Sequence, residues 1–345
     1  MVRATVLLPT HDHGRLLSIA AASALSQTIS DLELFIILDG ADSATARAAD
    51  EVAAADSRVR LFVHAKGARH GEAYRHLALQ EAQGRIVCYL SDDDIWFPDH
   101  IEYLDGLLRN ADFAHSQTVV VEPGGNIGVP YHGNLEDPWF REWLTGPHNF
   151  IPLSAAAHTL TAYRSLAVGW SPAPVDVWTD LHMWRKFLAA PGLRFASGGR
   201  PTVVHFPSPF RTEMTPHDRL DEMRSWWERL QMPGGWQVFR DQAVDRMAAQ
   251  AAALAKERSI LAAELDRVQS RLTTSEQTSV ALGREREALL AAVARSEAVA
   301  ARLDRELAAI KGSLAYRASR RMATIPVIGR IGRWVAAALV GRRGR

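Results

Sequence analysis

Three consecutive aspartates, Asp92 to Asp94, are the residues of this sequence with the clearest capacity for chemistry. They follow the run 85–90, whose length and β-branched and aromatic content predict a buried strand. Like charges this close repel one another unless a cation lies among them, and Mg²⁺ or Mn²⁺ prefers carboxylate oxygens together with substrate phosphates. The alternative is a solvated acidic turn or a helix cap. We therefore expect a divalent metal site in a loop at the carboxyl end of a strand.

The elements that must position this cluster alternate between strands and helices from residue 4 to about residue 206. The predicted strands are 4–9, 32–38, 59–63 and 85–90, and the predicted helices between them are 16–25, 43–55 and 71–83. Strands separated by helices of this length form a doubly wound, mostly parallel α/β sheet. The polar residues Thr10, Asp12, Asp39 and Arg75 should then gather with the acidic cluster along its carboxyl edge, where such sheets bind nucleotides.

Composition narrows the class of protein. The 345 residues are 47% hydrophobic with a formal charge of +1, which fits a sizeable globular domain with an additional part and indicates no nucleic-acid partner. The single cysteine, Cys88, lies in a predicted strand, so we expect no disulfide framework and a reducing, cytoplasmic location. The apolar run 4–8 is too short for a signal peptide or a membrane span. No Gly-x-Gly-x-x-Gly or P-loop motif follows the first strand, which argues against dinucleotide enzymes and P-loop ATPases.

The order of the motifs resembles that of the inverting family 2 glycosyltransferases, which have the GT-A fold. The likeness extends over roughly residues 2–211 and rests on the segments 6–12, 35–40, 73–76 and 84–94. It implies a nucleotide-diphosphate sugar as donor, a Mg²⁺ or Mn²⁺ ion held by the acidic motif, and inversion at the anomeric carbon. The sequence departs from the family pattern at Leu38 and Ser91, which replace the first acids of Asp-Asp-Gly and Asp-x-Asp.

The resemblance also implies a role for each matching residue. The residues expected to contact the nucleotide sugar are Pro9, Thr10, Asp12, Asp39, Arg75 and Asp92. Those expected at the metal are Asp93 as the first choice, with Asp92, Asp94 and His205. His205 follows an apolar strand, and related folds sometimes bring a late histidine to the metal; an ordinary strand residue is the alternative. We do not assign His11 and His13 to the metal, because alternation beside a strand end should send neighbouring side chains in different directions.

The predicted general base lies in the segment 177–188, where apolar residues recur at helical spacing. This segment resembles the family's Glu-Asp-x-Asp-Leu-Trp helix, with Asp180 on the catalytic aspartate, Thr179 in place of Glu and His182 in place of the second Asp. An inverting transfer is a single displacement, so it needs a base that takes the proton of the acceptor hydroxyl. The alternative for Asp180 is a plain helix N-cap.

The C-terminal third changes in character. After a predicted helical connector, 212–240, apolar residues recur in heptads over 241–312 and predict a long coiled coil that mediates self-association. A helical hairpin, a partner-dependent coil or a solvated spacer are the alternatives. Residues 313–345 combine basic residues with short apolar runs, which is typical of an amphipathic tail on an anionic membrane surface. Nucleic acid is the rival partner for such charges, but no base-reading module accompanies them.

These features predict a glycosyltransferase domain, 1–211, at the inner face of the cell membrane. By family analogy it transfers a sugar to a hydroxyl of a glycan or lipid-linked acceptor in surface polysaccharide or cell-envelope glycan synthesis. The aromatic segment 131–150 and the pair Trp226-Trp227 are candidates for the acceptor site, with core packing as the alternative. The alternative function is a catalytically inactive GT-A-like scaffold that acts through its coiled coil and basic tail, which the departures at Leu38 and Ser91 keep open.

Overall fold

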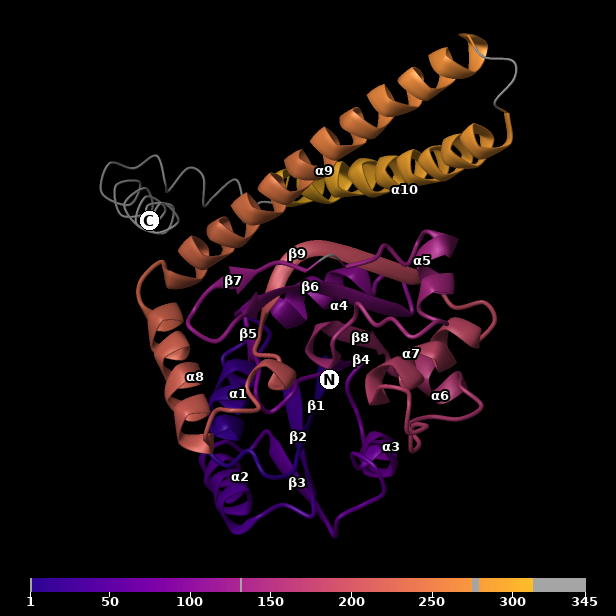
Figure 1. Ribbon diagram of the computed structural model, residues 1–345. Helices are drawn as coiled ribbons and strands as arrows, with labels where there is room; N and C mark the ends of the chain where they lie inside the picture. Colours follow the sequence, from indigo (N-terminus) through magenta and orange to yellow (C-terminus); the bar gives the residue numbers. More distant parts are fainter. Residues whose placement is uncertain (1, 131, 275–278, 313–345) are drawn as a thin grey trace. The chain divides into compact units, whose positions relative to one another are not determined.

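The computed structural model describes residues 2–130, 132–274 and 279–312, and the side chains of residues 270–284 lie outside that description. The chain divides into two units, Met1–Trp236 and Gln237–Arg345. Figure 1 shows the first unit as a sheet flanked by helices and the second as long helices. Each unit is described by itself below.

The first half of the sheet is parallel, as predicted. Its strands are β1 (Ala4–Thr10), β2 (Leu32–Asp39), β3 (Val59–His64) and β4 (Ile86–Tyr89). They lie in the order β3-β2-β1-β4, and every neighbouring pair is parallel. The connecting helices are α1 (Leu16–Leu25), α2 (Ser43–Ala55) and α3 (Glu72–Gln80). Figure 1 shows α1 and α2 on one side of these strands and α3 on the other, so both faces of the strands are covered.

The second half of the sheet mixes parallel and antiparallel pairs. Its strands are β5 (Ile95–Trp96), β6 (Phe113–Val121), β7 (Ile127–Gly128), β8 (Ala156–Thr159) and β9 (Phe195–His205). They continue the order as β8-β6-β9-β5, with β7 paired to β6. The helices here are α4 (His100–Leu107), α5 (Pro138–Trp143), α6 (Leu160–Ser165), α7 (Thr179–Ala189) and α8 (Pro216–Gln231), with short 3₁₀ turns at Leu153–Ala155 and Ser208–Phe210. The predicted α/β class is confirmed, and the antiparallel pairs are an addition that the sequence prediction did not describe.

The core on the α3 side of the sheet fixes the helix that carries Asp180. The strands contribute Leu7, Phe35 and Tyr89, and α7 contributes Trp184 and Phe187, all of them buried. Burying a large apolar side chain contributes about 1.5–3 kcal/mol to stability. Trp184 also satisfies its indole nitrogen, which donates to the Ile151 carbonyl at 3.0 Å. The position of α7 on the sheet is therefore well determined.

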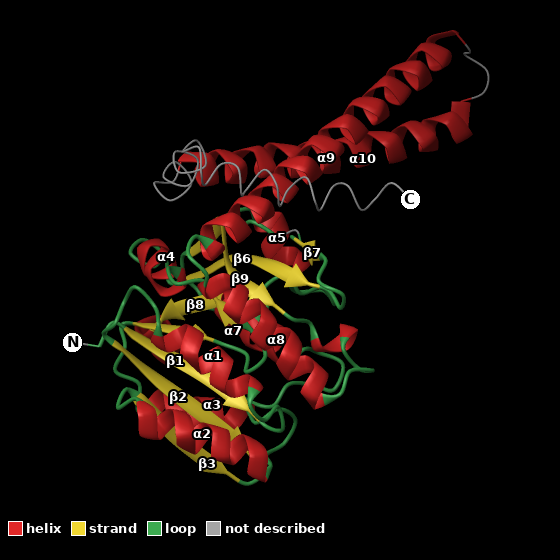
Figure 2. Ribbon diagram, turned by 90° about the vertical axis from the view of Figure 1, so that its left-hand side faces the viewer, coloured by secondary structure: helices red, strands yellow, loops and turns green. Residues whose placement is uncertain are grey.

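The second unit contains α10 (Ser279–Gly312) and all of α9 (Gly235–Thr274) except its first two residues. The two helices lie side by side in both views, which is the hairpin arrangement that the sequence left open as an alternative to one long coil (Figures 1 and 2). The apolar side chains buried in this unit include Leu265, Val268, Val293, Leu303 and Ile310. Among the described helices, none is long and apolar enough to cross a membrane. The predicted basic tail, 313–345, lies outside the described residues.

Candidate functional site

The carboxyl ends of three parallel strands meet at one edge of the sheet. Thr10 at the end of β1 is in register with Leu38, the residue before Asp39 on β2. Leu7 is in register with Tyr89, so β4 also ends at this edge. The chain then turns sharply, with the Asp94 amide donating to the Ser91 carbonyl at 3.2 Å. The three aspartates therefore occupy a tight turn beside the ends of β1 and β2.

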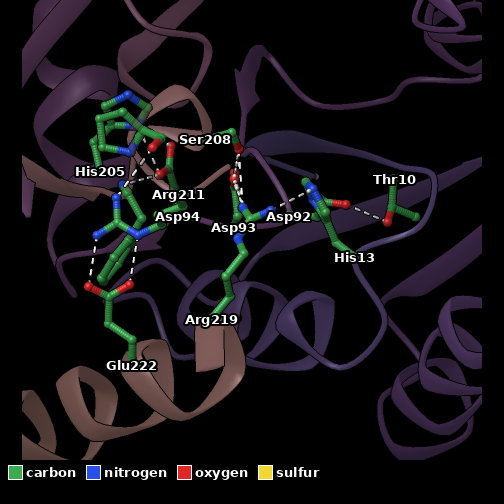
Figure 3. Close-up of polar contacts among 12 residues, drawn as sticks. Thr10, His13, Asp92, Asp93, Asp94, His205, Ser208, Arg211, Arg219 and Glu222 are labelled. Carbon is green, nitrogen blue, oxygen red and sulfur yellow. Dashed lines mark hydrogen bonds and ion pairs between the residues drawn. The ribbon is translucent and has the colours of Figure 1, made fainter. Parts of the chain in front are cut away.

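Asp92 faces the first strand of the sheet. Its carboxylate accepts a hydrogen bond from Thr10 Oγ1 at 2.5 Å and contacts Nδ1 of His13 at 2.7 Å (Figure 3). The hydrogen bond to Asp92 is the main reason that the pKa of His13 is raised to about 9, although burial of the ring opposes the shift. Burial raises the pKa of the Asp92 carboxyl, and the contact with His13 works against that change. Asp92 and His13 thus form a tightly coupled pair.

Asp93 points toward the chain that follows the last strand. Its Oδ2 accepts from Ser208 Oγ at 2.7 Å and from Arg219 Nη2 of α8 at 2.8 Å (Figure 3). Burial alone favours the neutral acid, but the charge of His13, the bond from Ser208 and the Arg219 guanidinium lower the pKa of Asp93 below its usual value. This carboxylate is therefore ionised and already has a cationic partner.

Asp94 is held by the protein on several sides. It accepts from Ser154 Oγ at 2.5 Å and from the Phe206 amide at 3.0 Å, and it contacts Nδ1 of His205 at 2.9 Å. Burial lowers the pKa of His205, but the neighbouring Asp94 outweighs it and raises that pKa above its usual value. Asp94 and His205 therefore pair with each other and tie the acidic turn to the end of β9.

One group of side chains in the described part of the chain has the spacing of a metal site. It consists of His13, Asp92 and Asp93, whose ligand atoms all lie within 4.8 Å of one another. The two carboxylates suit Mg²⁺ or Mn²⁺, and the imidazole, which binds a metal only in its neutral form, is a better ligand for Mn²⁺ than for Mg²⁺. The residues therefore fit the kind of ion that the sequence implied. Asp94 and His205 are not part of this group. His13 was not expected at the metal, because alternation beside the strand end should have turned it away, yet the structure places it against Asp92.

The predicted nucleotide residues surround a cavity of about 190 Å³ at this edge. It is lined by Pro9, Thr10, Asp39, Arg75 and Asp92, together with His11, His13, Lys66 and Gly71. Asp39 is held in place because its carboxylate accepts from the Gly67 amide and from Lys66 Nζ, both at 2.6 Å. Asp12 is exposed and does not line the cavity, and neither do Asp93 and Asp94. We refer to this space as the donor cavity.

A second cavity of about 410 Å³ contains Asp180. Both cavities are lined by Arg69, His70, Arg75 and Leu153, so the two spaces adjoin. Asp180 lies in the first turn of α7 but is not its N-cap, because that position is Trp178 and no side chain caps the helix. Burial raises the pKa of Asp180, while the Leu181 amide and the charge of Arg75 oppose the change.

Arg75 is the buried cation between the two cavities. Only 5% of the residue is exposed, and its guanidinium lies 4.8 Å from the centre of the Trp170 ring. Nη2 donates to the His70 carbonyl at 3.1 Å, whereas Nε is buried and lacks a hydrogen-bond partner among the described residues. Burial lowers the pKa of Arg75, and the charges of Glu72, Asp180 and Asp39 counteract this. A buried cation with an unused donor, close to carboxylates of both cavities, is suited to an anionic ligand.

Glu72 joins the two helices that border these cavities. It is fully buried at the start of α3 and accepts from the His70 amide at 3.0 Å. Its other oxygen accepts from Thr179 Oγ1 of α7 at 3.0 Å and from the Ala173 amide at 3.3 Å. Hydrogen bonds keep the pKa of Glu72 below its usual value although burial favours the neutral acid. One carboxylate therefore fixes the start of α7 against the start of α3.

A third cavity of about 400 Å³ adjoins the cavity that contains Asp180. Its aromatic lining residues are Trp143, Phe150, Trp178 and Phe210. Trp178 also lines the second cavity, and Asn149, which lines the third, forms a side-chain hydrogen bond with Asp180. Trp226, by contrast, is buried in α8 and lines none of these spaces. We refer to this space as the aromatic cavity.

Known proteins resemble the part of the chain that forms this edge. Residues 5–163 match Glycosyl transferase family 2. The glucosyltransferase WfgD of Escherichia coli, a UDP-Glc:alpha-D-GlcNAc-diphosphoundecaprenol beta-1,3-glucosyltransferase, is 27% identical over 128 residues, which cover 36% of this chain and 49% of WfgD. Chondroitin synthase of Escherichia coli is 30% identical over 167 residues, which cover 46% of this chain and 23% of the synthase. The chain thus spans about half the length of the first relative and less of the second.

Two solved structures have a partly similar chain trace. S. aureus TarS 1–349 in complex with UDP-GlcNAc has 14% identity and a TM-score of 0.47, over 59% of this chain and 58% of that chain. The mannosyltransferase PcManGT of Pyrobaculum calidifontis, in complex with GDP-Man and Mn²⁺, has 19% identity and a TM-score of 0.43, over 90% of this chain and 86% of that chain.

The mixed sheet, with carboxylates at the carboxyl edge of its parallel strands, defines the first unit as an α/β domain of the GT-A type. Residues 5–163 of this unit, somewhat less than half of the chain, are those that match Glycosyl transferase family 2. The family resemblance inferred from the sequence motifs is therefore confirmed.

Proposed function

We propose that this protein is an inverting glycosyltransferase that moves a sugar from a nucleotide-diphosphate sugar to a hydroxyl of a glycan or lipid-linked acceptor. One observation carries the proposal: the donor cavity adjoins the cavity of Asp180, and Arg75 lines both. A donor with its nucleotide in the first space can place its sugar in the second.

The donor cavity has a distinct role for each of its charged groups. Asp39 is a fixed, buried acceptor, which suits the N–H groups of a nucleobase. Arg75 offers a buried positive charge where the donor passes from one cavity to the other. Asp92, held by Thr10 and His13, is positioned to accept from a ribose hydroxyl. These roles agree with those that the family resemblance implied.

The reaction needs compensation for the charge that develops on the leaving diphosphate. A bound Mg²⁺ or Mn²⁺ supplies it by drawing negative charge from the phosphate oxygens. Among the residues that we describe, His13, Asp92 and Asp93 would hold the ion. Asp94 keeps the acidic turn in shape through its bonds to Ser154 and Phe206.

Asp180 is the proposed general base. It must take the proton of the acceptor hydroxyl on the side of the sugar opposite the leaving group. Its raised pKa makes the carboxylate a stronger base than an ordinary aspartate. The aromatic cavity beside it suits the acceptor, because aromatic faces pack against the apolar face of a sugar ring.

The proposal is tested by transfer assays with a panel of nucleotide sugars, Mn²⁺ and lipid-linked or oligosaccharide acceptors. Asp180→Asn should lower kcat by about 10²- to 10⁴-fold, the usual contribution of a general base. Asp176→Asn is the matched control, since Asp176 lines the same cavity but is exposed, and it should stay near wild type. If transfer is detected and Asp180→Asn leaves it unchanged, the assignment of the base is wrong. If no donor is hydrolysed or transferred by any protein, the inactive scaffold is the better account.

We further propose that the protein works in surface polysaccharide or cell-envelope glycan synthesis on the cytoplasmic face of the membrane. The support is the lipid-linked acceptor in the name of the WfgD relative, together with the basic residues of 313–345. Self-association through α9 and α10 is part of this proposal. Flotation with anionic liposomes, with and without 313–345, tests the membrane contact, and light scattering tests self-association. Equal flotation of the two proteins would refute the membrane contact of 313–345. A monomeric mass would refute self-association.

A further inference from the structure

The proposed metal site already contains a cation from the protein itself. Nη2 of Arg219 lies 2.8 Å from Asp93 Oδ2 and 3.1 Å from Ser208 Oγ. Nη1 of the same guanidinium lies 3.4 Å from Nε2 of His13. Arg219 therefore contacts two of the three side chains whose ligand atoms cluster within 4.8 Å. Figure 3 shows its side chain reaching from α8 to the acidic turn.

The helix that carries Arg219 is firmly placed. Thr215 and Asp218 form a reciprocal capping box at its start. Glu222, on the next turn after Arg219, accepts from Arg211 Nε at 2.7 Å and from Arg211 Nη2 at 2.9 Å. Arg211 is itself buried and donates to the Val121 carbonyl of β6 at 2.9 Å. The contact between Arg219 and Asp93 is therefore built into the packing of α8.

A divalent ion that binds Asp93 must compete with this guanidinium. Two cations at the same carboxylate oxygen repel each other strongly where water is partly excluded, and Asp93 is buried. The Arg219 side chain is long and 15% exposed, so it can swing toward solvent while α8 stays anchored through Glu222. We propose that Mg²⁺ or Mn²⁺ enters the site by exchange with the Arg219 guanidinium, which holds Asp93 when no ion is bound. This inference rests on the proposed function of the site.

The test is the affinity for Mn²⁺ alone, measured on the full-length protein without donor or acceptor. Titration calorimetry, or the free-Mn²⁺ signal in electron paramagnetic resonance, gives the Kd without any need for transfer activity. Arg219→Ala and Arg219→Gln remove the competing charge and should bind Mn²⁺ at least about tenfold more tightly than wild type, because a charge-assisted bond no longer has to be broken. Arg219→Lys keeps a cation and should bind more nearly as wild type does.

Arg224→Ala is the matched control. Arg224 lies on the same helix and pairs with the exposed Asp221 at 2.9 Å, away from the acidic turn, so its loss should leave the Kd unchanged. Circular dichroism and urea unfolding establish that each variant is folded. If Arg219→Ala does not fold, the test is made with Arg219→Gln, whose neutral side chain can still donate to Asp93. The exchange is refuted if the neutral variants bind Mn²⁺ no more tightly than wild type, or if no protein binds it. Transfer activity is a separate readout, so a failure here is distinguishable from a failure of the proposed function.

Discussion

Gly71 offers a sharp test of the donor cavity, because an added methyl group would collide with Asp39. The residue has a left-handed backbone, with φ of 68°, immediately before α3. A Cβ atom there would lie 2.7 Å from Asp39 Cγ and 2.8 Å from Asp39 Oδ2. Gly71→Ala should therefore push the Asp39 carboxylate away from Lys66 and the Gly67 amide.

The size of the effect follows from two costs. A left-handed alanine loses roughly 1–2 kcal/mol, and overpacking adds about 1–3 kcal/mol, so the free energy of unfolding should fall by about 2–5 kcal/mol. If Asp39 binds the donor through charge-assisted hydrogen bonds, its displacement removes about 1.5–3 kcal/mol of binding. That corresponds to a Kd raised by about ten- to a hundredfold.

Gly192→Ala separates the collision from the backbone strain. Gly192 has a comparable φ of 79°, but an added Cβ meets no atom within 4 Å. Urea unfolding should show only the strain of about 1–2 kcal/mol for this variant. Calorimetric titration with the best-binding nucleoside diphosphate should show wild-type affinity for Gly192→Ala and the large loss for Gly71→Ala. The reasoning is refuted if a folded Gly71→Ala protein binds the nucleotide as wild type does, or if both variants lose the same affinity.

Two further predictions concern acid stability and the acceptor. Burial lowers the pKa of His158 to about 4 in the folded protein, whereas an unperturbed histidine has a pKa of about 6.5. The contribution of neutral His158 to the free energy of unfolding is therefore complete above about pH 6.5 and is lost as the pH falls toward 4. Between pH 7 and pH 5 the unfolded state takes up the proton and the folded state does not, which costs about 2 kcal/mol. His158→Gln should lose about that much less than wild type in urea unfolding; an identical pH dependence would contradict the assignment. Phe210→Ala should raise the KM for acceptor about fivefold or more and leave donor hydrolysis unchanged, because Phe210 lines the aromatic cavity alone and an aromatic contact is worth about 1 kcal/mol. Trp139→Ala, which removes an exposed tryptophan outside the three cavities, is its control, and an equal effect of both variants would dismiss the aromatic cavity as the acceptor site.

The parallel half of the sheet was accessible from the sequence because its signals are local. The apolar runs that end near Thr10, Asp39 and Leu90 gave the strands, and parallel pairing then required their carboxyl ends to meet. The structure also explains why leucine replaces the family's acid at position 38. Leu38 is buried in β2, where an unpaired carboxylate would be costly. The mixed half was harder to predict, because β8 is only four residues long and starts with two alanines.

The partners of the acidic turn could not be predicted, because they come from distant parts of the chain. Arg219 lies 126 residues after Asp93, and Ser208 lies 115 residues after it. The chain that follows β9 brings them there, with Ser208 in the 3₁₀ turn Ser208–Phe210 and Arg219 in α8. His13 was set aside on the argument of strand alternation, but strict alternation holds only within a strand, and β1 ends at Thr10 before the chain bends. Its ring is free to turn back toward Asp92.

The buried carboxylate of Glu72 fixes the helices of Arg75 and Asp180 to each other before any ligand binds. It ties Thr179, next to the proposed base Asp180, to the helix that carries Arg75. Both halves of the proposed reaction centre are thus assembled when the chain folds, before the proposed donor binds. Little movement of Asp180 relative to Arg75 then remains to be made during turnover, and the proposed adjustment on metal binding is left to the Arg219 side chain.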